Sequence, residues 1–70
     1  MGISIDKKKI LQKARRLERK AEKLLLISDF YLGPVGLYET AWKLYEEAGD
    51  IKSAERCRRK YGDLSDALWD

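Results

Sequence analysis

The feature that most constrains this chain is a long stretch, from Ser4 to Ile27, that contains neither glycine nor proline. Within it, apolar residues recur at alternating intervals of four and three positions, at Ile10, Ala14, Leu17, Ala21 and Leu24. This spacing places the five side chains along one side of an α-helix, where they can meet another helix. We therefore predict one long helix, over about residues 5–27, packed within a bundle.

The same predicted helix carries most of the positive charge of the chain. Residues 6–23 contain nine basic and three acidic side chains, although the whole chain has a formal net charge of only +3. Five of the basic residues repeat the spacing of the apolar ones and form an outer stripe, called the basic ridge here: Lys9, Lys13, Arg16, Lys20 and Lys23. Their charges add along one line, so the basic ridge is a candidate nucleic-acid-binding surface.

Two other interpretations of the basic ridge stand beside this one. It is also what a solvated helix face looks like, supported by the i,i+3 pairs Arg15–Glu18 and Arg19–Glu22. Alternatively, it could meet acidic groups of the same chain, of another protein or of a membrane surface. No aromatic residue is interleaved with the ridge, which argues against stacking on a single strand but leaves attraction to a phosphate backbone open.

A different kind of segment follows, SDFYLGPVG at residues 28–36, which holds the only proline and two of the five glycines. A helix does not run easily through such a sequence, so we predict a linker over residues 28–34. Phe30, Tyr31 and Leu32 are too apolar for a solvated loop, and we expect them to pack inward and close the core. The alternative is an exposed aromatic recognition loop.

Two Gly-Asp dipeptides punctuate the remainder of the chain, at Gly49-Asp50 and Gly62-Asp63. A glycine can end a helix in the left-handed conformation, and an aspartate can cap the helix that follows. We therefore predict a helical hairpin over about residues 35–61 and a short last helix over about residues 64–69. The predicted fold is all-α: a single small domain over residues 1–70, built as a compact bundle of three helices plus a short C-terminal fourth.

The hairpin resembles a tetratricopeptide-type repeat. Tyr38 and Tyr45 are aromatic residues of its first helix, Gly49-Asp50 lies at the turn, and Ala54 follows Tyr45 by nine residues, as in the family pattern. The chain departs from that pattern at Trp42, Arg58 and Asp66. The resemblance covers about 30 of the 70 residues and implies an antiparallel helix pair with a protein-binding role.

The sequence contains little that could support catalysis. It has no histidine, no glycine-rich phosphate loop and no metal-ligand spacing of cysteine or histidine. Cys57, the single cysteine, has no base to activate it, so we expect a small buried side chain rather than a nucleophile. We therefore predict no enzymatic activity, no cofactor, no metal and no small-molecule substrate.

Location follows from two further observations. One cysteine leaves no internal disulfide, which favours the reducing cytoplasm. The longest apolar run, residues 24–27, is far shorter than the roughly 20 residues that span a bilayer, so we predict no membrane span.

Together these observations predict a non-enzymatic protein–protein interaction or scaffolding module, with self-association as one form of that role. A domain of this size buries only about 60% of the surface of its unfolded chain, so a partner would stabilise it. Interfaces also favour aromatic residues, and the candidate protein-binding residues are Phe30, Tyr31, Trp42 and Trp69, against the interpretation that most of them are core. The alternative function is nucleic-acid binding through the basic ridge.

Overall fold

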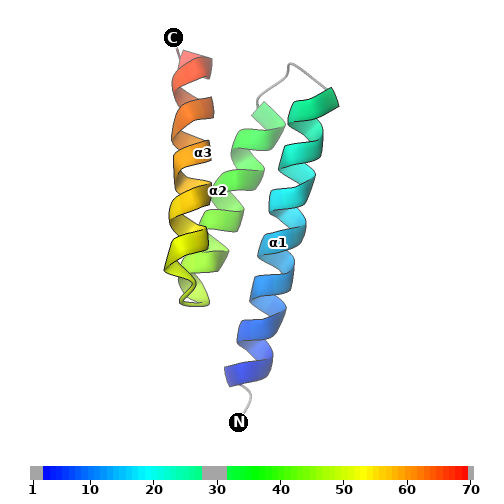
Figure 1. The fold of residues 1–70 in the computed structure, drawn as a ribbon, viewed down its shortest axis with the longest axis vertical. Coiled ribbons are helices and arrows are strands. Elements are labelled where there is room, and N and C mark those ends of the chain that lie inside the picture. Colours follow the sequence, from blue (N-terminus) through cyan, green and yellow to red (C-terminus); the bar gives the residue numbers. More distant parts are fainter. Residues whose placement is uncertain (1–2, 28–31, 70) are drawn as a thin grey trace.

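A computed structural model of the chain describes the backbone of residues 3–27 and 32–69, and the side chains of residues 7–27 and 32–68. The described backbone forms three helices, α1 (Ile3–Ile27), α2 (Leu32–Glu47) and α3 (Ile51–Trp69), shown in Figure 1. No strand occurs in these two ranges. The prediction of an all-α bundle built from three packed helices is therefore confirmed.

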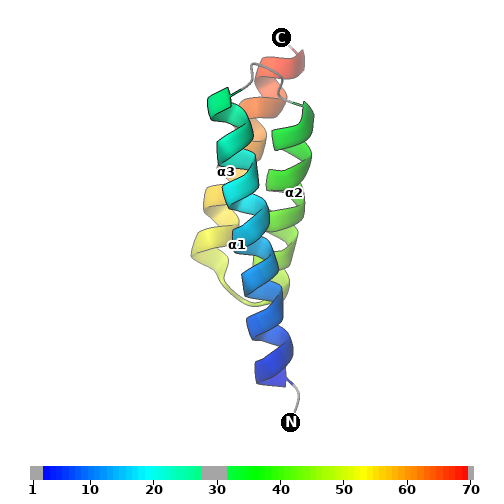
Figure 2. The same cartoon turned by 90° about the vertical axis from the view of Figure 1, so that its right-hand side faces the viewer.

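The helices are arranged around α2. Consecutive helices run antiparallel, so α1 and α3 point in the same direction (Figures 1 and 2). Both pack against α2 along its length, whereas they barely contact each other. The first turns of α1 extend beyond the turn that joins α2 to α3. α2 is thus the central helix of the fold, with α1 and α3 packed on either side of it.

The core is built from small residues and two tyrosines. The fully buried cluster consists of Ala14, Ala21, Tyr38, Ala41, Tyr45, Ala54 and Cys57. Alanine on each helix lets the backbones approach closely, and the two tyrosine rings of α2 fill the volume between them. The larger apolar residues of α1, including Leu17, are only partly buried at the margin of this cluster.

The first Gly-Asp dipeptide ends α2 and begins α3, as predicted. Gly49 has φ of 83°, its N–H donates to the carbonyl of Glu46 at 3.0 Å, and the N–H of Asp50 donates to that of Tyr45 at 2.9 Å. This pair of bonds is the Schellman arrangement that closes helices. The Asp50 carboxylate then accepts from the Ser53 N–H at 3.3 Å and from the Ser53 hydroxyl at 2.9 Å, which caps α3.

The second Gly-Asp dipeptide does not end a helix, so the prediction of a separate fourth helix over residues 64–69 is wrong. α3 continues through Gly62 and Asp63 to Trp69. Tyr61 and Leu64 lie on both sides of the dipeptide, and both pack against the core. A continuous helix keeps them on one face, and a glycine inside a helix costs only about 1 kcal/mol.

The start of α2 also differs from the prediction, because the helix begins at Leu32 and not near Val35. Pro34 is buried in its first turn, where a missing N–H costs no helical hydrogen bond. The predicted linker over residues 28–34 is therefore too long. The Leu32 side chain is 58% exposed and does not close the core, while Phe30 and Tyr31 lie outside the described residues.

No helix in the described part of the chain is both long enough and apolar enough to cross a membrane.

Candidate functional site

One cluster of polar side chains joins all three helices, and we call it the Glu18 node. Glu18 of α1 is buried, and its Oε1 accepts from the hydroxyl of Tyr45 on α2 at 2.9 Å. Arg56 of α3 reaches the same carboxylate with both arms, Nε to Oε2 at 2.7 Å and Nη2 to Oε1 at 2.9 Å. Its guanidinium also lies 5.9 Å from the centre of the Tyr45 ring. The node is thus the main link between α1 and α3.

The pKa values in the Glu18 node follow from this geometry. Burial alone would raise the pKa of Glu18, but the hydrogen bonds from Arg56 and Tyr45 and the charge of Arg56 outweigh it, so the pKa lies below its ordinary value. Burial, followed by the bond to Glu18, raises the pKa of Tyr45 to about 12. Burial and the nearby Glu18 charge also raise the pKa of Cys57 to about 12. At neutral pH the carboxylate is therefore charged, and the phenol and thiol are protonated.

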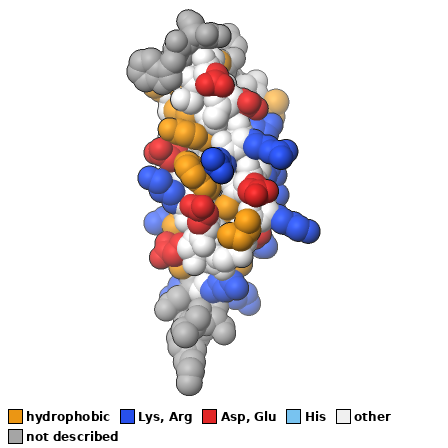
Figure 3. All heavy atoms as spheres, turned by 90° about the vertical axis from the view of Figure 1, so that its left-hand side faces the viewer, with side chains coloured by type: hydrophobic (Ala, Val, Ile, Leu, Met, Phe, Trp, Pro, Cys, Tyr) orange, Lys and Arg blue, Asp and Glu red, His pale blue; other side chains and the backbone are white. Residues whose placement is uncertain are grey.

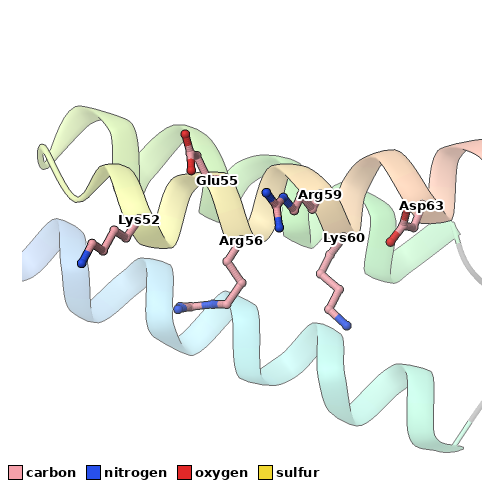
Figure 4. Close-up of a pocket in the computed structure, with 6 residues that line it drawn as sticks. All are labelled: Lys52, Glu55, Arg56, Arg59, Lys60 and Asp63. Carbon is pink, nitrogen blue, oxygen red and sulfur yellow. The ribbon is translucent and has the colours of Figure 1, made fainter.

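A shallow groove runs between α1 and α3 over the Glu18 node. Its floor includes Tyr45, and its walls include Arg15 and Arg19 of α1 and Ser53 of α3. Figure 4 shows that Lys52, Arg56 and Lys60 of α3 extend toward α1, while Glu55 points away. Basic side chains therefore border the groove from both helices.

The basic ridge lies on the outer side of α1, as predicted. All five of its residues, Lys9, Lys13, Arg16, Lys20 and Lys23, are exposed. The expected pairs Arg15–Glu18 and Arg19–Glu22 do not form among the described side chains, where the single ion pair joins Glu18 to Arg56. Arg15 and Arg19 line both the α1–α3 groove and a depression beside Arg16, Lys20 and Lys23. The basic surface is therefore continuous from the ridge to the groove.

The opposite side of the molecule has a different character. On the face seen in Figure 3, acidic and basic side chains alternate around a broken line of hydrophobic ones. α2 carries Glu39, Glu46 and Glu47 against a single lysine, Lys43. Positive charge is therefore concentrated on α1 and on the edge of α3 that faces it.

Of the four candidate protein-binding residues, Trp42 is the one whose side chain is described. It is partly buried against the core, and its ring centre lies 5.7 Å from that of Tyr61 on α3. Phe30 and Tyr31 lie outside the described residues, and so does the side chain of Trp69. Trp42 therefore has a packing role and keeps only a partly exposed surface for contact.

Three exposed apolar side chains lie at the end of the bundle where α1 ends and α2 begins, and the sequence analysis did not single out two of them, Leu26 and Ile27. Leu26 is 85% exposed, Ile27 is 79% exposed, and Leu32 is the third. We call them the apolar end. The signal was present in the sequence: residues 24–27 are four consecutive apolar residues on a helix, and successive side chains turn by about 100°, so they cannot all face the core.

The described residues contain no group of three or more cysteine, aspartate or glutamate side chains placed to hold a metal ion. Comparison with protein-family models, with curated proteins and with solved structures gave no match to this chain.

Proposed function

We propose that this protein is a non-enzymatic protein–protein interaction module that binds through the apolar end, and that a second copy of the chain is the first partner to test. The observation that carries the proposal is the exposure of Leu26, Ile27 and Leu32 at one end of the bundle. Large aliphatic side chains left in water are stabilised when a partner covers them, by roughly 25 cal/mol for each Å² of apolar surface buried.

The sequence around the apolar end supports the same role. Ile27 and Leu32 bracket residues 28–31, which include two of the candidate protein-binding residues, Phe30 and Tyr31. Aromatic residues flanked by aliphatic ones have the composition that the centres of protein interfaces favour. A binding surface at this end would therefore combine aliphatic and aromatic side chains within a short segment.

The α2–α3 hairpin gives the proposal a second line of support. Tyr38, Tyr45 and Ala54, which carry the resemblance to a tetratricopeptide-type repeat, are all buried between the helices. Repeats of that kind bury their apolar faces by stacking on neighbouring units. A lone hairpin with one additional helix would gain from another chain in the same way, and such an assembly needs no catalytic chemistry.

The test is the solution mass of the protein over a concentration series, measured by light scattering after size exclusion. We expect a concentration-dependent dimer that the double variant Leu26→Glu/Leu32→Glu abolishes while its helical circular dichroism is retained. The control at a different site is Ile51→Glu, because Ile51 is 57% exposed and begins α3 at the opposite end of the bundle. A monomer at every concentration, or equal effects of the two changes, would remove self-association through the apolar end.

A further inference from the structure

We infer that the exposed side of α1 is a docking surface for duplex DNA, which it contacts through the phosphate backbone and independently of base sequence. This surface is separate from the apolar end, and it consists of the basic ridge together with Arg15 and Arg19. The inference therefore does not depend on the proposed interaction role.

The first argument is the arrangement of the charges. The ridge extends from Lys9 to Lys23 on one helix, a rise of about 21 Å. Its charges follow one another every three or four residues, or about 5 Å, on a helix held in place by packing against α2. Duplex DNA carries one phosphate per roughly 1.7 Å of its axis, so a partner phosphate is within reach of every ridge side chain.

The second argument is that this charge is not neutralised within the described part of the molecule. Glu18, the buried acidic residue of α1, forms an ion pair with Arg56 of α3. Glu22 is the other acidic side chain described on α1. The pairs Arg15–Glu18 and Arg19–Glu22, which would have neutralised part of this charge within α1, do not form among the described side chains. Closely spaced like charges repel one another, and binding to a polyanion relieves that repulsion.

The third argument selects the partner. From Lys9 to Lys23 the described exposed residues of α1 are charged or polar, and Gln12 is the single uncharged one. A membrane-bound amphipathic helix would need its apolar face free, but that face of α1 is packed on α2. This surface has no aromatic residue, so it lacks the side chains on which a single strand would stack. The centres of protein interfaces favour aromatic residues and are depleted of lysine, whereas this surface is rich in lysine. A phosphate backbone requires only the positive charges that are present.

DNA is favoured over duplex RNA by shape. The major groove of B-form DNA is about 12 Å wide and admits an α-helix, whereas the major groove of an A-form duplex is too narrow for protein side chains to read. α1 is the longest helix of the described chain, and its first turns project beyond the other two helices (Figure 2). A helix at the edge of the bundle therefore suits the groove of B-form DNA better than that of an A-form duplex.

The experiment is a fluorescence-anisotropy titration of a labelled DNA duplex of about 20 base pairs, long enough to cover the whole ridge, over a series of salt concentrations. We expect binding at about 50 mM salt that weakens steeply as salt rises, with a log–log slope of roughly −0.9 for each phosphate neutralised. The affinity should be the same for a duplex of scrambled sequence, because phosphate contacts carry no sequence information.

Two double variants with equal loss of charge test the assignment to α1. Arg16→Gln/Lys20→Gln should reduce the magnitude of the salt slope by roughly 2, one unit for each lost phosphate contact. Lys43→Gln/Arg58→Gln removes two exposed charges from α2 and α3 and should leave the slope unchanged. Circular dichroism confirms that both variants fold.

Three outcomes would overturn the inference. They are the absence of duplex binding at about 50 mM salt, an equal effect of the two double variants, and a preference through the ridge for another polyanion. The last is measured by competition with an RNA duplex, with a polyglutamate peptide and with phosphatidylserine vesicles. Titrating at protein concentrations at which the solution mass is that of a monomer keeps the tests of the two proposals separate.

Discussion

Gly49-Asp50 and Gly62-Asp63 are the same dipeptide, yet the chain reverses at the first and continues as a helix through the second. At the first, Asp50 finds Ser53 three residues later and caps α3 with it. At the second, the residue three positions after Asp63 is Asp66, which has no hydroxyl to make the side-chain bond that Ser53 makes with Asp50. The side-chain hydrogen bond that helps to cap α3 is therefore available at the first dipeptide and not at the second.

Packing separates the two dipeptides further. Cys57, Tyr61 and Leu64 form one stripe on α3 that spans Gly62, and all three belong to the core or its margin. A break at Gly62 would turn Leu64 away from that stripe, whereas the reversal at Gly49 brings the stripe of α3 onto that of α2. The local signal decides the outcome only where it agrees with the burial of apolar residues.

The largest change in stability is expected in the Glu18 node, because Arg56, which lies between the two dipeptides, is held there. Glu18→Ala leaves the Tyr45 hydroxyl without its buried partner and releases Arg56, so it should destabilise the fold by about 2 kcal/mol. Urea unfolding followed by circular dichroism measures the change. A loss below about 0.5 kcal/mol would mean that the segment between the two dipeptides is held by its turn and its apolar stripe alone.

A smaller but more specific effect is expected from replacing the two glycines. Gly49→Ala should destabilise the fold by about 1–2 kcal/mol, because alanine is strained at φ of 83°. Gly62→Ala should stabilise the fold by up to about 1 kcal/mol, since its position is helical and nothing lies within 4 Å of an added Cβ atom. Thermal melts of both variants provide the comparison, and changes of the same sign would contradict it.

Replacing the two aspartates should also affect stability more at the first dipeptide than at the second. Asp50→Ala removes the cap of α3 and should cost about 1 kcal/mol. Asp63→Ala should stay within about 0.5 kcal/mol of the parent, because Asp63 is exposed inside a helix. Asp50→Asn is the control, since an asparagine side chain can still accept the Ser53 N–H. If Asp50→Ala had no effect, the Schellman bonds alone would account for the turn.

The smallest expected effect is the part of the acid sensitivity of folding stability that Glu18 contributes. The pKa of Glu18 is lowered on folding, so its contribution to stability is complete above the ordinary carboxyl pKa of 4.5 and is lost as the pH falls through the folded value. Melting temperatures measured from neutral pH down to about pH 3 should therefore fall less steeply for Glu18→Gln than for the parent chain. Parallel curves for the two proteins would show that other carboxylates carry the acid sensitivity.

The spacing of apolar residues was sufficient to predict α1, and the Gly49-Asp50 dipeptide was sufficient to predict the turn, because both signals depend on neighbours within a few positions. The exposure of the basic ridge followed from the same spacing. The Glu18 node could not be predicted in this way, because Glu18 and Arg56 are 38 residues apart and Arg15 offered a nearer partner. Gly62 was misjudged because its conformation depends on Leu64 reaching the core and not on the dipeptide itself.

The single thiol of this chain has a use that follows from its position. Cys57 is fully buried in the middle of α3, and its raised pKa keeps it protonated in the folded protein. A thiol-alkylating reagent can attack it only after α3 separates from α2, and there is no second cysteine to compete. The rate of alkylation therefore reports how often the α2–α3 hairpin opens, without any added label.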